Sequence, residues 1–162
     1  MSGRVLGIDP GTAVTGYGVV EPADGHLGFL VECGVIRTAA HAPLARRLGT
    51  IYDGVTELIE RHRPVALALE SVFHAKNVRT TVTLGQARGV ILLAAERSGL
   101  SIAEFPPATV KKSIVGTGRA AKAQVGFMVQ KLLKLAAPPT PDDAADGVAL
   151  ALTYLIVGGG PS

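Results

Sequence analysis

The chain has 162 residues, of which 48% are apolar and 18% charged, so it is long enough to bury a core and its composition excludes extended disorder. It carries 16 Lys and Arg residues against 13 acidic residues, which gives a net charge of +3. A modestly basic surface suits a polyanionic partner such as nucleic acid. A slightly basic protein with no such partner has the same balance, so charge alone leaves both interpretations open.

Targeting signals are not visible in the sequence. The N-terminal stretch 1–9 has no long apolar run before its first charge, so we expect no signal peptide. The longest apolar run, residues 147–160, is too short to span a bilayer. The single cysteine, Cys33, rules out an intramolecular disulfide and fits a reducing compartment. We therefore expect a cytoplasmic protein without a membrane partner.

The first seventy residues predict three strands, a helix and a fourth strand. The apolar run 4–9 predicts a buried strand, and Tyr17, Val19 and Val20 belong to a second one. Asp24-Gly25 is a hairpin signal that leads into a third strand over 27–37, so the chain opens with an antiparallel meander. Apolar residues spaced by three and four from Leu44 to Ile59 predict a helix, which Pro64 ends. Because a helix precedes it, a fourth strand over 65–70 should run parallel to the first.

The remainder of the chain predicts one more strand among several helices. After a polar connection over 71–79, we expect a helix over 78–98, a strand over 100–105, and helices over 108–115, 122–135 and from Pro141 onward. We find no repeat and no second domain, so we expect one domain over 1–158 and a short tail over 159–162. This order of elements is typical of an α/β, ribonuclease-H-like fold: a mixed five-stranded sheet flanked by helices.

Four carboxylates stand where this topology should bring distant segments together. Asp9 ends the first strand and Glu70 ends the fourth, and these strands are neighbours in the predicted sheet. Asp143 and Asp146 lie three residues apart near the start of the last helix, and therefore on one face of it. A cluster of carboxylates repels itself unless divalent cations occupy it. The pattern predicts a metal site.

Each acid also has a simpler explanation. Asp9 begins Asp-Pro-Gly, a common turn sequence, and Glu70 can be a solvated strand end. Thr140 and Asp143 can form a capping box, with Pro141 at the first helical position. Asp146 is harder to dismiss, because the helix from Ala144 onward is apolar nearly all round and carries no Lys or Arg. A buried, unpaired carboxylate is costly, so a metal ion is the expected partner of Asp146.

Basic residues gather in the segments that follow the fourth and fifth strands, at the end of the sheet where Glu70 stands. They form three groups: Lys76 and Arg79; Lys111 and Lys112; Arg119 and Lys122. Any single one of them is better explained as an ordinary solvated side chain. Phe73 lies in the polar connection just past Glu70, where it can either stack on an unpaired base or fill the core.

Four segments resemble the RuvC family of Holliday-junction resolvases: residues 7–18, 70–77, 84–89 and 143–146. The resemblance covers nearly the whole chain. It implies that Asp9, Glu70, Asp143 and Asp146 coordinate two Mg²⁺ or Mn²⁺ ions. It also implies that Lys111 and Lys122 assist cutting and that Phe73 engages bases at the junction centre.

The same resemblance implies a metal-dependent endonuclease from a bacterium. It would act as a homodimer on four-way DNA junctions, nick two opposed strands symmetrically, and leave 5′-phosphate ends during homologous recombination and DNA repair. It would cooperate with the branch-migration proteins RuvA and RuvB. The helix over 78–98 has apolar residues on more than one side, so we expect it to contribute to the dimer interface.

Three other functions compete with this one. Gly7-Ile-Asp-Pro-Gly-Thr12 resembles the phosphate loop of actin-like and sugar-kinase ATPases, but those proteins need two such domains and this chain supplies one. A non-catalytic junction-binding protein is disfavoured because all four acids are present. A ribonuclease-H-like nuclease acting on RNA stays open, since Phe73 and the basic loops favour branched DNA without excluding RNA.

Overall fold

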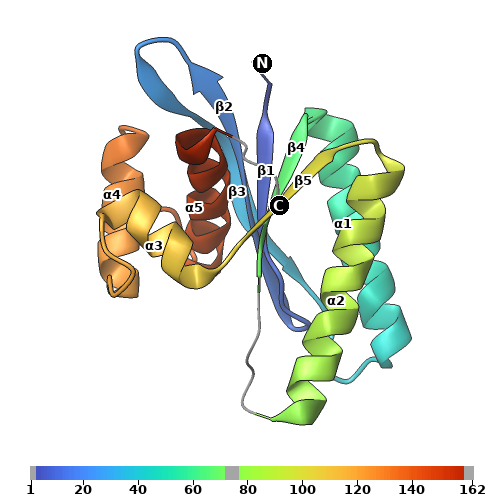
Figure 1. Ribbon diagram of the computed structural model, residues 1–162. Coiled ribbons are helices and arrows are strands. Elements are labelled where there is room, and N and C mark those ends of the chain that lie inside the picture. Colours follow the sequence, from blue (N-terminus) through green and yellow to red (C-terminus); the bar gives the residue numbers. More distant parts are fainter. Residues whose placement is uncertain (1–2, 72–76, 159–162) are drawn as a thin grey trace.

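A five-stranded mixed sheet forms the centre of the protein, in a computed structural model that describes residues 3–71 and 77–158 (Figure 1). The strand order is β3-β2-β1-β4-β5. β1 (Val5–Asp9), β2 (Val14–Ala23) and β3 (His26–Arg37) form an antiparallel meander. β4 (Ala66–Glu70) pairs in parallel with β1, and β5 (Ser101–Phe105) pairs in parallel with β4. The predicted meander and the predicted parallel crossover are both confirmed.

Helices cover both faces of this sheet, so the molecule has three layers (Figure 1). α1 (Leu44–His62) and α2 (Val78–Arg97) lie on one face. α3 (Pro107–Val115), α4 (Lys122–Leu132) and α5 (Asp142–Val157) lie on the other. Each side has its own apolar core, because the buried strand residues alternate between the two faces. None of the helices in the described part of the chain combines the length and apolar character of a membrane span.

The helix ends differ from the predicted ones by a few residues. The helix expected over 122–135 ends at Leu132, because Lys134 adopts a left-handed conformation with φ 56°. The chain turns back there, and the Leu135 amide donates to the Gln130 carbonyl at 2.9 Å. The expected tail, residues 159–162, lies outside the described residues.

α5 lies directly against the backbone of β1 and β2. A Cβ added at Gly147 of α5 would sit 2.5 Å from the Tyr17 Cα, and one added at Gly7 of β1 would sit 2.0 Å from the Gly147 carbonyl oxygen. A Cβ at Gly16 of β2 would come within 1.8 Å of the Asp143 carbonyl oxygen. Glycine at these positions therefore removes the layer of side chains that normally separates a helix from a sheet. The first two turns of α5 are brought as close to β1 and β2 as the backbone allows.

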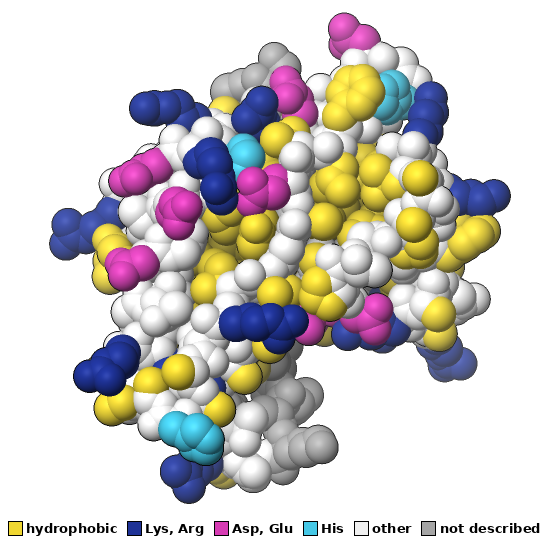
Figure 2. All heavy atoms as spheres, turned by 180° about the vertical axis from the view of Figure 1, so that it is seen from behind, with side chains coloured by type: hydrophobic (Ala, Val, Ile, Leu, Met, Phe, Trp, Pro, Cys, Tyr) yellow, Lys and Arg dark blue, Asp and Glu magenta, His cyan; other side chains and the backbone are white. Residues whose placement is uncertain are grey.

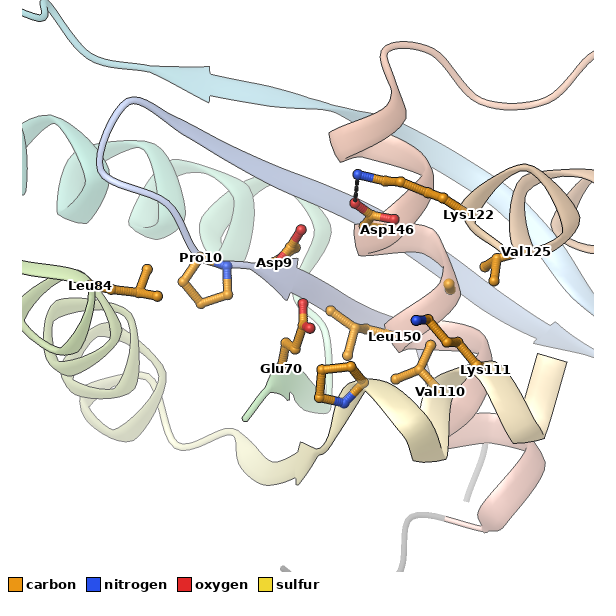
Figure 3. Close-up of a pocket in the computed structure, with 12 residues that line it drawn as sticks. Asp9, Pro10, Glu70, Leu84, Val110, Lys111, Lys122, Val125, Asp146 and Leu150 are labelled. Atoms are coloured by element: carbon orange, nitrogen blue, oxygen red, sulfur yellow. Dashed lines mark ion pairs between the residues drawn. The ribbon is translucent and has the colours of Figure 1, made fainter. Parts of the chain in front are cut away.

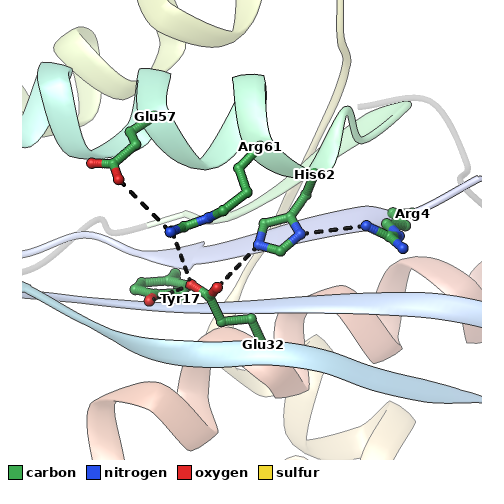
Figure 4. A network of polar contacts seen from close by, with 6 residues as sticks. All are labelled: Arg4, Tyr17, Glu32, Glu57, Arg61 and His62. Atoms are coloured by element: carbon green, nitrogen blue, oxygen red, sulfur yellow. Dashed lines mark hydrogen bonds and ion pairs between the residues drawn. The ribbon is translucent and has the colours of Figure 1, made fainter.

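A network of charged side chains connects α1 to β2 and β3 (Figure 4). Glu32 of β3 accepts a hydrogen bond from the Tyr17 hydroxyl at 2.7 Å and lies 3.2 Å from both Arg61 Nη2 and His62 Nε2. Burial and the neighbouring Glu32 carboxylate raise the pKa of Tyr17 to about 12. Burial opposes ionisation of Glu32, but hydrogen bonds from Tyr17 and His62 and the charge of Arg61 lower its pKa. The network satisfies its own charges and serves to hold α1 on the sheet.

Replacing Gly147 by Ala should destabilise the protein, although Ala is the better helix former. The added methyl group meets the backbone of Tyr17, which cannot rotate away, so we expect a loss of about 1–3 kcal/mol in the free energy of unfolding. Urea denaturation measures this loss. Gly49→Ala in α1 is the matched control: its added methyl meets no atom within 4 Å, so it should stabilise by about 0.5–1 kcal/mol. Equal stabilisation by both substitutions would contradict the close approach of α5.

Candidate active site

Asp9 and Glu70 lie side by side at the ends of two parallel strands. Ile8 of β1 pairs with Leu69 of β4, so the next residue of each strand occupies the same level of the sheet. The turn after Asp9 is closed by the buried Thr15, whose hydroxyl donates to the Gly11 carbonyl at 2.7 Å. Asp9 is therefore held at the end of a strand rather than free in a turn. The predicted juxtaposition of these two acids is confirmed.

α5 brings two further carboxylates to the same place. Asp9, Asp143 and Asp146 each offer one oxygen, and these oxygens all lie within 4.8 Å of one another. α5 begins at Asp142, with Pro141 at its N-cap position and no side-chain cap. The alternative in which Thr140 and Asp143 form a capping box, with Pro141 as the first helical residue, is therefore wrong. The carboxylate of Asp143 belongs to the acidic group.

A cavity of about 400 Å³ opens over these acids (Figure 3). Asp9, Glu70 and Asp146 project into it, and Lys111 and Lys122 also line it, with Lys122 next to Asp146. Glu70 lies outside the group of three carboxylates but lines the same cavity. The remaining wall is apolar and includes Val110, Val125 and Leu150. Carboxylates and ammonium groups thus line one space that is open to solvent.

Lys122 is the partner of Asp146. The Nζ atom of Lys122, in the first turn of α4, lies 3.0 Å from Asp146 Oδ2. Asp146 is therefore not unpaired, as the sequence of its own helix suggested, because a neutralising cation comes from a different helix. The role of Asp146 as a metal ligand stays a prediction. Lys111 also lines the cavity and makes no ion pair with any residue from 3 to 71 or from 77 to 158. The two lysines therefore differ in their freedom to meet a ligand.

Two of the acids, Asp9 and Asp146, have raised pKa values. Burial, together with a hydrogen bond to Glu70 and its negative charge, raises the pKa of Asp9 to about 8. Burial also raises the pKa of Asp146 to about 6, against the opposing effect of Lys122. The hydrogen bond to Asp146 in turn raises the pKa of Lys122. Clustered carboxylates are the donors that divalent cations such as Mg²⁺ and Mn²⁺ prefer, so these residues fit a metal centre.

Arg88 of α2 is a supporting residue that we did not predict. Its Nε donates to the backbone carbonyl of Glu70 at 3.3 Å, and its Nη2 forms an ion pair with Glu104 of β5. The guanidinium thus anchors the end of β4. The sequence contains a signal for this pair: Glu104 is the one charged residue of β5, and Arg88 follows the buried Ala87 on the helix that packs there.

The other predicted nucleic-acid contacts are distributed around the cavity. Arg79, Lys112 and Arg119 are exposed. Arg79 lines a hollow of about 340 Å³ next to Gly11, and Leu84 borders both this hollow and the cavity. On the rear face, basic and acidic side chains are interspersed rather than gathered in one basic patch (Figure 2). Phe73 and Lys76 lie outside the described residues.

Comparisons with known proteins agree on one family. The family described as crossover junction endodeoxyribonuclease RuvC matches residues 5–154. A relative of that name from Pelotomaculum thermopropionicum is 51% identical over 150 residues, covering 93% of this chain and 91% of its own. The solved structure of Thermus thermophilus RuvC superposes with a TM-score of 0.89 at 36% identity, covering 96% of this chain and 95% of that one. T. thermophilus RuvC in complex with a Holliday junction substrate gives a TM-score of 0.87 at 32% identity, with coverage of 96% and 94%.

Without a bound cation, the protein should lose stability as the pH rises from about 4 to about 8. In this window the raised pKa of Asp9 means that the folded state binds more protons than the unfolded state, so each step up in pH favours unfolding. Asp9→Asn should therefore melt at a higher temperature than the parent at pH 8 in EDTA, and should respond less to added Mg²⁺ or Mn²⁺. Thermal melting across this pH range measures both effects.

The matched control for this measurement is Asp53→Asn, which changes an exposed acid on α1. It should leave the pH dependence and the response to cations as they are in the parent. If Asp9→Asn melts below the parent at pH 8 in EDTA, the carboxylate of Asp9 is not destabilised by burial and by its acidic neighbours.

Proposed function

This chain belongs to the RuvC family of crossover junction endodeoxyribonucleases, and from that premise we propose that it resolves Holliday junctions at the cavity between β1, β4 and α5. Enzymes of this family are metal-dependent endonucleases with a ribonuclease-H-like fold. The observation that carries the assignment to this cavity is the convergence of Asp9, Asp143 and Asp146 within 4.8 Å, with Glu70 beside Asp9. The T. thermophilus relative, whose substrate in the complex is a Holliday junction, supports the same substrate here.

Asp9, Glu70, Asp143 and Asp146 are the proposed ligands of two Mg²⁺ or Mn²⁺ ions. Asp9 is the central member of this set, because it adjoins both the two acids of α5 and Glu70. Such ions lower the pKa of a bound water and stabilise negative charge on a phosphate. The open cavity above the carboxylates gives a DNA strand access to this position.

The two lysines have different proposed roles. Lys122 is paired with Asp146 at 3.0 Å, so its first effect is to orient that carboxylate. Lys111 faces the same cavity without a carboxylate partner among the described residues, which leaves its ammonium group available to the scissile phosphate. An ammonium group there stabilises the charge that develops on the phosphate oxygens during hydrolysis. Arg88 supports the reaction indirectly by holding the backbone of Glu70.

Junction arms extend beyond the cavity and need further contacts. We assign backbone-phosphate contacts to Lys76, Arg79, Lys112 and Arg119, and base stacking at the junction centre to Phe73. Arg79, at the hollow that adjoins the cavity through Leu84, has the best structural support among them. Contacts to phosphate supply affinity and register, while cleavage depends on the acids.

The exposed face of α2 is the proposed dimer interface. Val78, Val82 and Leu93 are 80%, 56% and 50% exposed on this helix. Gly85 and Gly89 fall between them at spacings of three and four, and an added Cβ at either glycine would meet no atom within 4 Å. Large exposed apolar side chains on one helical face are typical of an interaction surface. Symmetric cutting of two strands requires two active sites related by a twofold axis, which a homodimer through α2 provides.

The remaining features of the proposal follow from family membership. The nuclease domain comprises residues 1–158, with a tail over 159–162. The protein acts on chromosomal DNA in the bacterial cytoplasm during homologous recombination and DNA repair. It receives junctions from the RuvA and RuvB branch-migration proteins and leaves 5′-phosphate ends. The relatives that support this view are bacterial and carry the same enzyme name.

Val82→Glu should convert the dimer into a monomer, because it places a charge in an apolar contact. Sedimentation velocity measures the change, and the monomer should cut a junction at one strand at a time instead of two. Val157→Glu is the matched control, since Val157 is 43% exposed at the far end of α5 and should tolerate a charge. A Val82→Glu protein that sediments like the parent would place the interface elsewhere.

Asp146→Asn should reduce cleavage of a synthetic four-way junction by a factor of about 100 or more, because loss of a metal ligand costs at least as much as loss of its outer-shell support. Junction affinity should change little, since phosphate contacts survive. Denaturing gels with Mg²⁺ or Mn²⁺ measure the rate, and Asp53→Asn is the control that retains it. Parent protein that cuts an RNA–DNA hybrid faster than the junction would favour the ribonuclease alternative instead.

A further inference from the structure

A second hollow adjoins the catalytic cavity. It measures about 280 Å³ and lies between α4 and the segment that leads into α5, with Phe127, Pro138 and Pro139 among its walls. Lys122 and Asp146 border both this hollow and the cavity. The ion pair between Lys122 and Asp146 therefore separates the hollow from the cavity. A nucleotide whose phosphate occupies the cavity has this hollow within reach of its base.

The walls of the hollow suit an uncharged, flat ring. Phe127 is 51% exposed although it is a large aromatic side chain, and Lys131 Nζ lies 5.1 Å from its ring centroid. Among the residues that line the hollow, the ammonium group of Lys122 is already paired with Asp146 and the carboxylate of Asp142 is negatively charged, so the lining offers a phosphate no unpaired cation. The volume is slightly below the range of about 300–1,000 Å³ that is usual for drug-sized ligands, and fits a single ring system.

We propose that this hollow binds the base of one nucleotide next to the scissile phosphate, stacked on Phe127. The inference rests on the proposed function, because it needs a DNA strand in the catalytic cavity. Stacking on an aromatic ring holds any base, since every base has a π face. The contact would fix the position of the scissile phosphate by gripping the nucleotide beside it, at a site separate from the metal ligands. Phe127 is thus a positioning residue for the cut strand.

A double-mutant cycle between protein and DNA tests the contact. The two protein forms are the parent and Phe127→Ala. The two DNA forms are an intact junction and a junction with an abasic nucleotide next to the scissile phosphate. The abasic nucleotide is placed first on one side of this phosphate and then on the other. Single-turnover cleavage rates and junction affinities are measured for every combination. We expect Phe127→Ala alone and the abasic site alone each to slow cleavage by about tenfold. Together they should slow it by little more than either alone, because both remove the same contact.

Two variants make the result specific. Phe127→Tyr keeps the aromatic face and should restore the parent rate. Phe29→Ala removes an equally exposed phenylalanine, 57% exposed, from the opposite end of the sheet, and should cut both junctions at the parent rates. Both residues pair with β2, Phe29 with Glu21 near one end of this strand and Asp9 with Gly16 near the other, so Phe29 is far from the acids. Melting temperatures of all variants separate a local effect from unfolding.

The proposal is overturned if Phe127→Ala cuts at the parent rate, or if its effect multiplies with that of the abasic site on both sides of the scissile phosphate. A parent protein that binds junctions but cuts none would instead overturn the proposed function. In that case the double-mutant cycle can still be evaluated from junction affinities alone. If Phe127→Ala and the abasic site weaken binding independently of each other, the base-binding hollow is overturned as well.

Discussion

The contact between the α5 backbone and strands β1 and β2 is the constraint on which the rest of the structure depends. Gly16 pairs with Asp9 in the β1–β2 ladder, and the carbonyl of Asp143 lies directly over Gly16. A side chain at this position would push α5 outward and separate the acids of the helix from the acid of the strand. Packing and catalysis therefore share one requirement, which is that nothing larger than hydrogen occupies the space between helix and sheet.

This close packing has an electrostatic cost. It places three carboxylates within 4.8 Å of one another at the edge of an apolar core, where burial raises the pKa of Asp9 to about 8 and that of Asp146 to about 6. Lys122 offsets part of the repulsion through its ion pair with Asp146. The repulsion that remains favours the binding of protons or divalent cations by the carboxylates. The metal-free site therefore opposes folding, and a bound cation would support it. Strain of this kind is characteristic of functional centres.

The sequence predicted the parts of this architecture that depend on local pattern. Alternating apolar residues and the Asp24-Gly25 turn gave the meander, and the parallel crossover placed Asp9 beside Glu70. It could not show that Lys122, rather than Lys111, reaches Asp146, because that choice depends on how α4 packs against α5. The same holds for Arg88, whose partners Glu70 and Glu104 come from two different strands. The capping alternative at Thr140 failed because Pro141 itself occupies the cap position.

Arg88 also has a consequence for how two subunits would communicate in the proposed dimer. It lies on α2 between Gly85 and Gly89, the small residues of the exposed face, while its guanidinium holds the carbonyl of Glu70. In a dimer joined through α2, any sliding or tilting of this helix against its twin would reach the last residue of β4 through the Arg88 side chain. Subunit contact and active-site alignment are then mechanically linked, and the two incisions can be synchronised without either centre touching the other.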